Sequence, residues 1–281
     1  MNINKIKSFA KINLALNVTG KLTALHKIES IVTFVNLFDL ITIKRIQGKK
    51  HQIYFKGNFS RNITKDNTVK NLFNILDAHK LLENRKFQIK IKKNIPPEAG
   101  LGGGSMNAGN ILNFLIKKKI IKVNQKKILK IANLVGSDVI LGIDPKSSVL
   151  TSRNVIKKFS KIPTFYTLLV RPNFGCSTKK IYSGVKKFTK PAFSVPKKNM
   201  FGFKFLINQE NALEKIAFSK YPKLKKIKTF LETLKNPLFV RMTGSGSVLV
   251  AYYQKKQHCE LAKVQFKRKF KNYWCNTSKT I

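Results

Sequence analysis

The chain has 281 residues, with 56 lysines and arginines against 12 aspartates and glutamates, and a formal net charge of +44 at pH 7. Hydrophobic residues make up 43% of the chain, which allows a sizeable core and excludes a wholly disordered basic protein. Its three cysteines and four histidines are scattered, so the sequence predicts neither a zinc site nor a disulfide framework. No apolar run approaches the ~18 residues of a membrane span. We therefore expect a cytoplasmic protein, not attached to a membrane, with one large or two medium domains.

The positive charge alone would suggest a nucleic acid or another anionic partner. However, lysine supplies 49 of the 56 basic residues, and lysines are spread over almost every block of ten residues. Nucleic-acid-binding proteins usually concentrate their charge and interleave it with aromatic residues in a recognisable module, which is not found here. The composition fits the codon bias of an AT-rich genome. We therefore expect no specific nucleic acid as partner, although a basic nucleic-acid-binding protein remains the alternative of a different class.

Hydrophobic periodicity predicts the elements of the first half of the chain. Apolar and polar residues alternate over residues 11–18, which predicts a half-buried strand. Helical spacing of apolar residues predicts a helix over residues 67–83. Further strands are predicted at 28–37, 40–46, 52–55 and 87–91, and further helices around 108–115 and 128–135.

The second half mixes strands and helices in a similar way. Strands are predicted within 148–159 and at 165–170, helices at 210–219, 222–235 and 256–270, a strand–loop–strand at 240–253 and a closing strand at 274–280. The stretch 186–199 is rich in lysine and proline, which predicts an irregular loop. Because the elements do not alternate regularly as βαβ units, we expect an α+β protein with two domains, 1–158 and 159–281.

A glycine-rich segment, Gly100–Ser105, lies between a predicted strand and a predicted helix. Glycines let the backbone turn its N–H groups around an anion, and the positive end of the following helix points to the same place. The segment is not a Walker A loop, because no Gly-Lys-Ser/Thr follows, and its spacing is not that of a Rossmann fingerprint. It predicts a phosphate-binding loop; a flexible connector or a tight cap is the plainer alternative.

Three other elements carry chemistry of their own. The loop Thr243–Ser247 lies between apolar strands and could be an ordinary turn. Asp138, one of five aspartates, follows a Gly-Ser pair and could be an ordinary helix cap. Lys11 and Asn13 share the strand face opposite the apolar one, where a lysine could bind phosphate or lie in solvent.

In this order and spacing, these elements resemble the GHMP small-molecule kinases over essentially the whole chain. The resemblance rests on Ala-Lys-Ile-Asn-Leu at 10–14, His26, the long motif 96–110, Gly-Ser-Asp-Val at 136–139 and Arg-Met-Thr-Gly-Ser-Gly at 241–246. It implies a two-lobed α+β fold with the active site in the cleft between an N-terminal ATP-binding domain and a C-terminal domain. The triple glycine and the Ala-Lys-Ile-Asn opening are its most specific parts. They point to the branch that uses ATP to phosphorylate the 2-hydroxyl of cytidyl-diphosphate-linked methylerythritol, in the non-mevalonate route to isoprenoid precursors, rather than to homoserine or mevalonate kinases.

The resemblance also implies roles for single residues. Asp138 would be the base that takes the proton of the hydroxyl, and Lys11 would keep it ionised and stabilise the transferring phosphoryl group. On the substrate side, His26 would bind the edge of the cytosine and Tyr182 would pack on its ring, with Asn13, Thr243 and Gly244 nearby. ATP would be bound by Pro96, Pro97, Glu98, Ala99, Gly100, Leu101, Gly102, Gly103, Gly104, Ser105 and Met106. Mg²⁺ would accompany the ATP with no metal-binding side chain assigned, and the protein would be a monomer or a homodimer.

The chain departs from the family pattern at a few positions. Leu25 stands before His26 where the family has a tyrosine, so one of two stacking aromatic residues is missing. Glu98-Ala99 replaces a glycine pair, which adds a negative charge near the loop, and Met106 replaces a serine, which removes a hydroxyl near the phosphates. These departures keep two alternatives open: a GHMP kinase for another alcohol, and a non-catalytic relative that only binds nucleotides.

Overall fold

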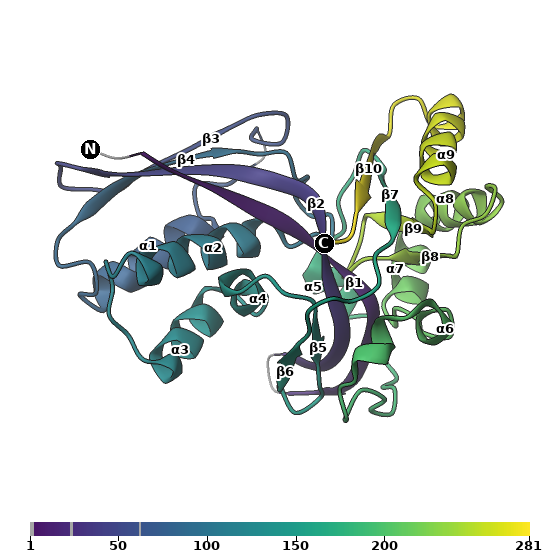
Figure 1. The fold of residues 1–281 in the computed structure, drawn as a ribbon, viewed down its shortest axis with the longest axis horizontal. Helices are drawn as coiled ribbons and strands as arrows, with labels where there is room; N and C mark the ends of the chain where they lie inside the picture. The colour runs from purple at the N-terminus through teal and green to yellow at the C-terminus, as the bar shows by residue number, and fades with distance from the viewer. Residues whose placement is uncertain (1–2, 23–24, 62) are drawn as a thin grey trace. The chain divides into compact units, whose positions relative to one another are not determined.

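The computed structural model of the protein describes residues 3–22, 25–61 and 63–281. The chain forms two compact units, and each is described by itself (Figure 1). Unit 1 comprises residues 1–10, 37–97 and 102–145, and unit 2 comprises residues 11–36, 98–101 and 146–281. Two long strands, β1 (Asn4–Lys21) and β2 (His26–Ile46), each contribute one segment to each unit. A boundary between two continuous domains at residue 158 stays a prediction.

The sheet of unit 1 places apolar residues of neighbouring strands opposite one another. β4 (Lys86–Lys92) runs antiparallel to β2, with Ile41 opposite Ile91 and Ile43 opposite Ile89. β3 (Gln52–Lys56) runs parallel to β4. These four isoleucines are at most 1% exposed. Their alternation with polar residues is the signature of a sheet with one covered face.

Helices cover that face of the unit 1 sheet, as Figure 1 shows. They are α1 (Thr68–Ala78), α2 (Gly103–Lys117), α3 (Gln125–Val135) and the short α4 (Val139–Ile143). α1 begins where the side chain of Asn67 accepts hydrogen bonds from the N–H groups of Val69 and Lys70. It ends at Ala78, earlier than predicted, because Lys80 adopts a positive φ of 54°, which ends a right-handed helix.

Asp39 lies in the middle of β2, where the sequence predicts a break between two strands. That prediction is wrong, because the carboxylate is satisfied inside unit 1 and the strand continues through it. Asp39 is 0% exposed and forms an ion pair with Lys93. It also accepts hydrogen bonds from the N–H groups of Asn94 (2.8 Å) and Ile95 (2.9 Å) and from Nδ2 of Asn107 (2.9 Å). One buried carboxylate thus joins β2, the segment after β4 and the first turns of α2.

Replacing Asp39 with alanine is expected to lower the free energy of unfolding by about 3–5 kcal/mol, because the buried charge of Lys93 would lose its partner. Equilibrium unfolding in denaturant measures the effect. The matched control is Asp66→Ala, which removes an exposed ion pair with Lys70 and should change stability little. Equal losses in the two variants would contradict the role given to Asp39.

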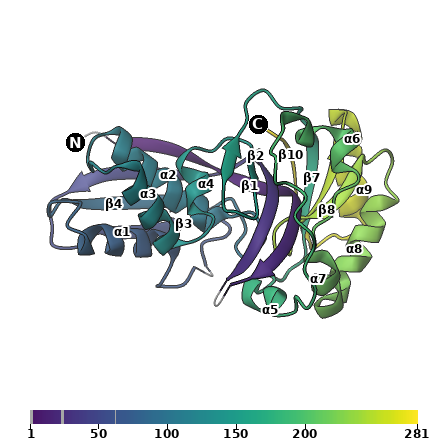
Figure 2. The ribbon, with the colours of Figure 1, turned by 90° about the horizontal axis from the view of Figure 1, so that it is seen from below.

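Unit 2 contains an antiparallel sheet in the order β10-β7-β9-β8. Its strands are β7 (Tyr166–Arg171), β8 (Phe239–Met242), β9 (Leu249–Tyr253) and β10 (Trp274–Lys279), all close to their predicted positions. α8 (Pro222–Glu232) and α9 (Lys256–Lys269) pack on this sheet through residues such as Leu224, Ile227 and Phe266 (Figure 2). The short strands β5 (Ser148–Leu150) and β6 (Ile156–Lys158) extend the pairing of β2.

The remaining elements of unit 2 are short, and most were not predicted. They are α5 (Thr178–Tyr182), the 3-10 helix η1 (Lys198–Phe201), α6 (Phe203–Leu206) and α7 (Glu214–Lys220). α7 begins four residues later than predicted because the backbone of Glu210 and Ala212 hydrogen-bonds to Leu16 of β1 instead. The irregular loop predicted over 186–199 is confirmed for residues 186–197, which form neither helix nor strand, whereas Lys198 and Asn199 already belong to η1.

Residues 11–18 of β1 are not half-buried as predicted, because both strand faces are covered. Lys11 and Asn13 are each 4% exposed, and Ala15 is fully buried. The polar groups on this face are hydrogen-bonded, as described below. The alternation of polar and apolar residues in β1 therefore does not indicate a face in contact with solvent. The face that carries Lys11 and Asn13 is buried, and its polar groups are hydrogen-bonded within the protein.

Candidate functional site

The glycine-rich motif runs through both units, and each part is described within its own unit. Pro96, Pro97 and residues 102–106 belong to unit 1, whereas Glu98, Ala99, Gly100 and Leu101 belong to unit 2. The same division places Asp138 in unit 1 and Lys11 in unit 2.

In unit 1, the motif forms the start of α2. Gly102 is the N-cap residue with a φ of 66°, a left-handed conformation that favours glycine, and no side chain caps the helix. The N–H groups of Gly103, Gly104 and Ser105 have no acceptor within the helix, because they belong to its first turn. Three donors and the positive end of a 15-residue helix therefore meet at one place, which suits a phosphate group.

The two glycines that follow Gly102 are required by close neighbours. A Cβ atom on Gly103 would lie 3.0 Å from Cγ2 of Ile95 and 3.2 Å from Nζ of Lys93. A Cβ atom on Gly104 would lie 2.6 Å from Oγ1 of Thr68. The triple glycine thus permits dense packing around the start of α2.

Met106, one turn into α2, is fully buried, and its N–H group donates to the carbonyl oxygen of Gly102 (2.8 Å). Neither its side chain nor its N–H group is therefore available at the surface of the first turn. Ser105 is partly exposed and carries the hydroxyl group at this end of the helix.

Asp138 occupies the N-cap position of α4, but its side chain makes no capping hydrogen bond. The ordinary helix cap that could explain this aspartate is thus absent. α4 packs closely on α2, since a Cβ atom on Gly109 would lie 2.4 Å from the carbonyl oxygen of Val139. A Cβ atom on Gly136 would lie 3.9 Å from Oγ of Ser105, so the turn before Asp138 adjoins the start of α2. Unit 1 therefore brings the glycine helix and the turn that carries Asp138 together.

In unit 2, Lys11 and Asn13 lie side by side on β1, as predicted. Nζ of Lys11 donates to Oδ1 of Asn13 over 2.6 Å, and the backbone N–H of Lys11 donates to the carbonyl oxygen of Leu101 over 3.1 Å. Nδ2 of Asn13 donates to Oγ of Ser30 on β2 (2.8 Å). The lysine is thus buried and oriented by an amide, next to the glycine-rich motif.

The loop after β8 completes this cluster within unit 2. Oγ1 of Thr243 accepts the N–H of Asn13 (3.0 Å) and donates to the carbonyl oxygen of Gly100 (3.1 Å). Gly244 has a φ of 54° and packs on Gly100. A Cβ atom on Gly100 would lie 1.9 Å from the carbonyl oxygen of Thr243, so only glycine fits there. Three segments far apart in the sequence therefore meet at Lys11, Asn13, Gly100 and Thr243.

The sequence reasoning missed the side chains that hold this loop in place. Nδ2 of Asn211 donates to the carbonyl oxygens of Met242 (2.8 Å) and Gly244 (2.7 Å). The buried guanidinium of Arg241 donates to the carbonyl oxygens of Leu14, Leu206 and Gln209. An asparagine in an apparently helical run carries no local sign of such a role.

His26 and Tyr182 also meet in unit 2. Their ring centroids lie 5.2 Å apart, with 38° between the ring planes. Burial and the nearby charge of Lys21 lower the pKa of His26. Leu25, where the family has an aromatic residue, is exposed. A neutral imidazole offers one donor and one acceptor, which suits a polar base edge.

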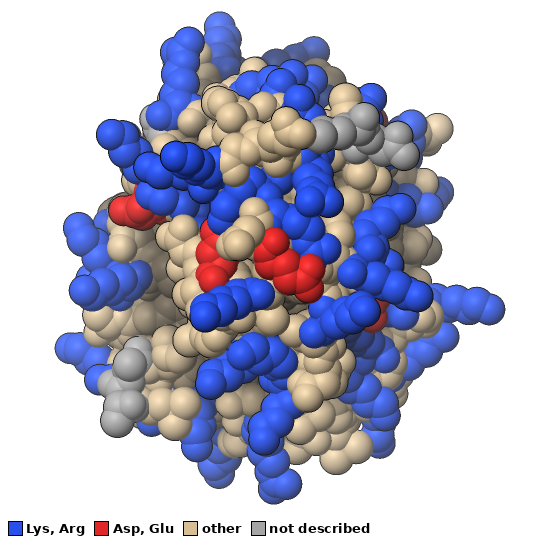
Figure 3. Space-filling model, turned by 90° about the vertical axis from the view of Figure 1, so that its left-hand side faces the viewer, with Lys and Arg blue, Asp and Glu red and all other residues tan. Residues whose placement is uncertain are grey.

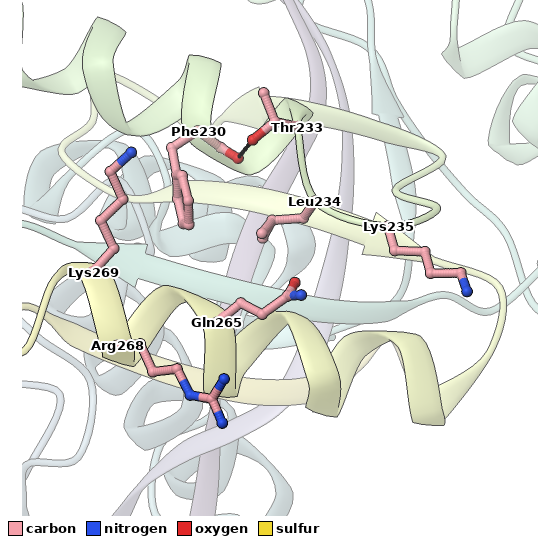
Figure 4. Close-up of a pocket in the computed structure, with 7 residues that line it drawn as sticks. All are labelled: Phe230, Thr233, Leu234, Lys235, Gln265, Arg268 and Lys269. Carbon is pink, nitrogen blue, oxygen red and sulfur yellow. Dashed lines mark hydrogen bonds between the residues drawn. The ribbon is translucent and has the colours of Figure 1, made fainter.

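A pocket between α8 and α9 does not belong to this site (Figure 4). Its lining contains no carboxylate or histidine that could take a proton, and none of the predicted site residues; it consists of Phe230, Thr233, Leu234, Lys235, Gln265, Arg268 and Lys269. Its positive charge is typical of the whole chain.

The surface charge shows no single concentrated stripe on the face in Figure 3, where lysine and arginine side chains are spread widely with uncharged surface between them. Within residues 3–22, 25–61 and 63–281, no three histidines, cysteines, aspartates or glutamates come together as a possible metal site. Across the same residues, no helix is both long and apolar enough to cross a membrane.

Comparison with known proteins identifies two family domains in the chain. Residues 67–145 match the GHMP kinases N terminal domain, and residues 197–272 match the GHMP kinases C terminal domain. The first match contains α1 to α4 with the glycine helix and Asp138, and the second contains the loop around Thr243.

Curated relatives and solved structures agree with these matches. The chain is 56% identical to the 4-diphosphocytidyl-2-C-methyl-D-erythritol kinase of Pelagibacter ubique over the full length of both proteins, and 32% identical to that of Ehrlichia canis over 93% of each. The fold matches a crystal structure of 4-(cytidine 5'-diphospho)-2C-methyl-D-erythritol kinase with a TM-score of 0.76 at 22% identity, covering 98% of this chain and 99% of that one. A homoserine kinase from Cytophaga hutchinsonii matches with a TM-score of 0.70, covering 100% and 95%. The expected α+β fold and family are thus confirmed, and the chain belongs to the GHMP kinase family, in the group of the 4-diphosphocytidyl-2-C-methyl-D-erythritol kinases.

Proposed function

We propose that the protein transfers the γ-phosphoryl group of ATP to the 2-hydroxyl of 4-diphosphocytidyl-2-C-methyl-D-erythritol, a step of the non-mevalonate route to isoprenoid precursors. The observation that carries the proposal is 56% identity, over the full length of both chains, to a kinase of that name. Two local arrangements support it: the glycine helix beside the turn that carries Asp138 within unit 1, and Lys11 held by Asn13 within unit 2.

In this proposal, Asp138 takes the proton from the 2-hydroxyl group of the substrate. The oxygen of that hydroxyl group attacks the γ-phosphorus of ATP, and ADP leaves. Phosphoryl transfer needs positioning and charge stabilisation more than covalent help. Asp138 lies at the start of α4, in a turn that adjoins the start of the glycine helix α2 within unit 1. Lys11, held by Asn13, supplies a fixed positive charge to the phosphoryl group.

The first-turn N–H groups of α2 and the hydroxyl of Ser105 would bind ATP phosphates. Mg²⁺ usually binds through substrate phosphates with one or two carboxylates and several waters. In this proposal Mg²⁺ would accompany the ATP phosphates bound at the start of α2. The bound ion would neutralise phosphate charge.

For base recognition, Tyr182→Ala should raise the KM for the cytidyl substrate while hardly changing the preference for cytosine over uracil, because any pyrimidine can pack on its ring. His26→Ala should erode that preference, because a polar edge contact discriminates between bases. Steady-state kinetics with the cytidyl and uridyl substrates measure both effects. Unchanged kinetics in both folded variants would contradict this base site.

The proposed reaction is tested by the release of ADP from ATP with a panel of acceptors. Turnover should be high with the cytidyl substrate and low with free methylerythritol, homoserine, mevalonate or no acceptor. Preferred turnover of another alcohol would establish a different GHMP kinase activity. ATP binding without turnover of any acceptor would establish a non-catalytic relative.

A further inference from the structure

A third aromatic ring lies beside His26, on a segment to which neither the sequence nor the family resemblance assigns a role. The ring centroid of Phe188 is 6.5 Å from that of His26, with 53° between the planes. Phe188 is 48% exposed, so its ring is accessible to a ligand. We infer that Phe188 binds the base of the nucleotidyl substrate together with His26 and Tyr182; this inference rests on the proposed function.

The backbone around Phe188 is fixed although it forms no helix or strand. The N–H and the Oγ1 of Thr189 both donate to the carbonyl oxygen of Val18 on β1, over 2.8 Å and 3.1 Å. The fully buried carboxylate of Glu29 on β2 accepts the N–H groups of Ala192 (2.7 Å) and Phe193 (3.1 Å). The segment is therefore anchored both to β1 and to β2, the strand that begins at His26.

An exposed ring on an anchored backbone is suited to bind a flat ligand. Little conformational freedom is lost when the ligand binds, because the backbone of the loop is already held in place. Aromatic rings bind nucleobases through their faces with little regard to base identity, whereas polar groups select the base. His26 would therefore provide selection, and Tyr182 and Phe188 would provide affinity.

The absence of an aromatic ring at Leu25 strengthens this assignment. It directly precedes His26 and is 64% exposed, so an apolar side chain is available there. An aliphatic side chain offers contact area but no π-face for a base. Phe188 supplies such a ring from a distant segment of the chain, 162 residues after His26.

The test measures binding of CDP to the whole protein and steady-state kinetics with ATP and the cytidyl substrate. Phe188→Ala should weaken CDP binding and raise the KM for the cytidyl substrate by about 5- to 100-fold. The KM for ATP and the preference for cytosine over uracil should not change. Phe188→Trp should retain affinity, and Phe188→Leu, which keeps apolar area without a ring, should lose it.

The matched control is Phe203→Ala on α6, which removes another partly exposed phenylalanine of unit 2 and should leave CDP binding unchanged. Wild-type affinity for CDP in Phe188→Ala, or equal losses in Phe188→Ala and Phe203→Ala, would overturn the inference. CDP binding is read without turnover. A wild-type protein that binds CDP through Phe188 but does not phosphorylate the cytidyl substrate would therefore refute the proposed reaction and keep the base site.

Discussion

Replacing Asp138 with asparagine is expected to lower kcat by about 100- to 10,000-fold, because general base catalysis contributes that much to proton transfer. The amide has nearly the same shape as the carboxylate but cannot take the proton. Since the carboxylate makes no capping hydrogen bond, α4 should keep its start. Single-turnover kinetics measures the rate of the chemical step, and calorimetry measures the affinity for ATP. Together they distinguish a slower reaction from weaker nucleotide binding.

The matched control is Asp144→Asn at the other end of α4, which should turn over normally. The two variants make the same chemical change at the two cap positions of one five-residue helix. Near-normal turnover in Asp138→Asn, or an equal loss in Asp144→Asn, would contradict the assignment of the base.

Replacing Lys11 with methionine is expected to lower kcat by about 100- to 1,000-fold, as for the loss of one group that stabilises transition-state charge. Methionine has a similar length without the charge. Because Lys11 is buried, the apolar replacement should be tolerated, and the melting temperature should stay near that of the wild type. The KM for ATP should change less than kcat.

Lys5→Met is the control for Lys11, because Lys5 lies on the same strand but is exposed. It should have wild-type turnover. If Lys11→Met keeps full turnover, its catalytic role is wrong; if it unfolds, the buried lysine is a structural residue.

The sequence predicted the elements whose stability depends on their own pattern. The strands of unit 2 at Tyr166–Arg171 and Leu249–Tyr253 and the helix Lys256–Lys269 lie close to their predicted positions. It failed where a distant group decides the local structure. β2 continues through Asp39 because Lys93 and Asn107, 54 and 68 residues away, satisfy the carboxylate.

The residues of the candidate site can likewise be divided into those that a local sequence pattern reveals and those whose role depends on distant groups. The glycines and the few carboxylates of the chain point to the predicted phosphate-binding loop and to Asp138, because the residue type itself limits what the position can do. Asn211 and Glu29 act through partners that no local pattern reveals, namely the carbonyl oxygens of Met242 and Gly244 and the N–H groups of Ala192 and Phe193. Their roles become visible only when the segments are brought together in unit 2.

The most direct test of the proposed function is the position of the transferred phosphoryl group. The purified protein is incubated with ATP, Mg²⁺ and 4-diphosphocytidyl-2-C-methyl-D-erythritol, and the product is analysed by phosphorus and carbon NMR. We expect one new phosphate on the 2-oxygen of the methylerythritol and one ADP for each product molecule. Phosphate on another oxygen, or ADP release without a phosphorylated cytidyl product, would contradict the proposed reaction.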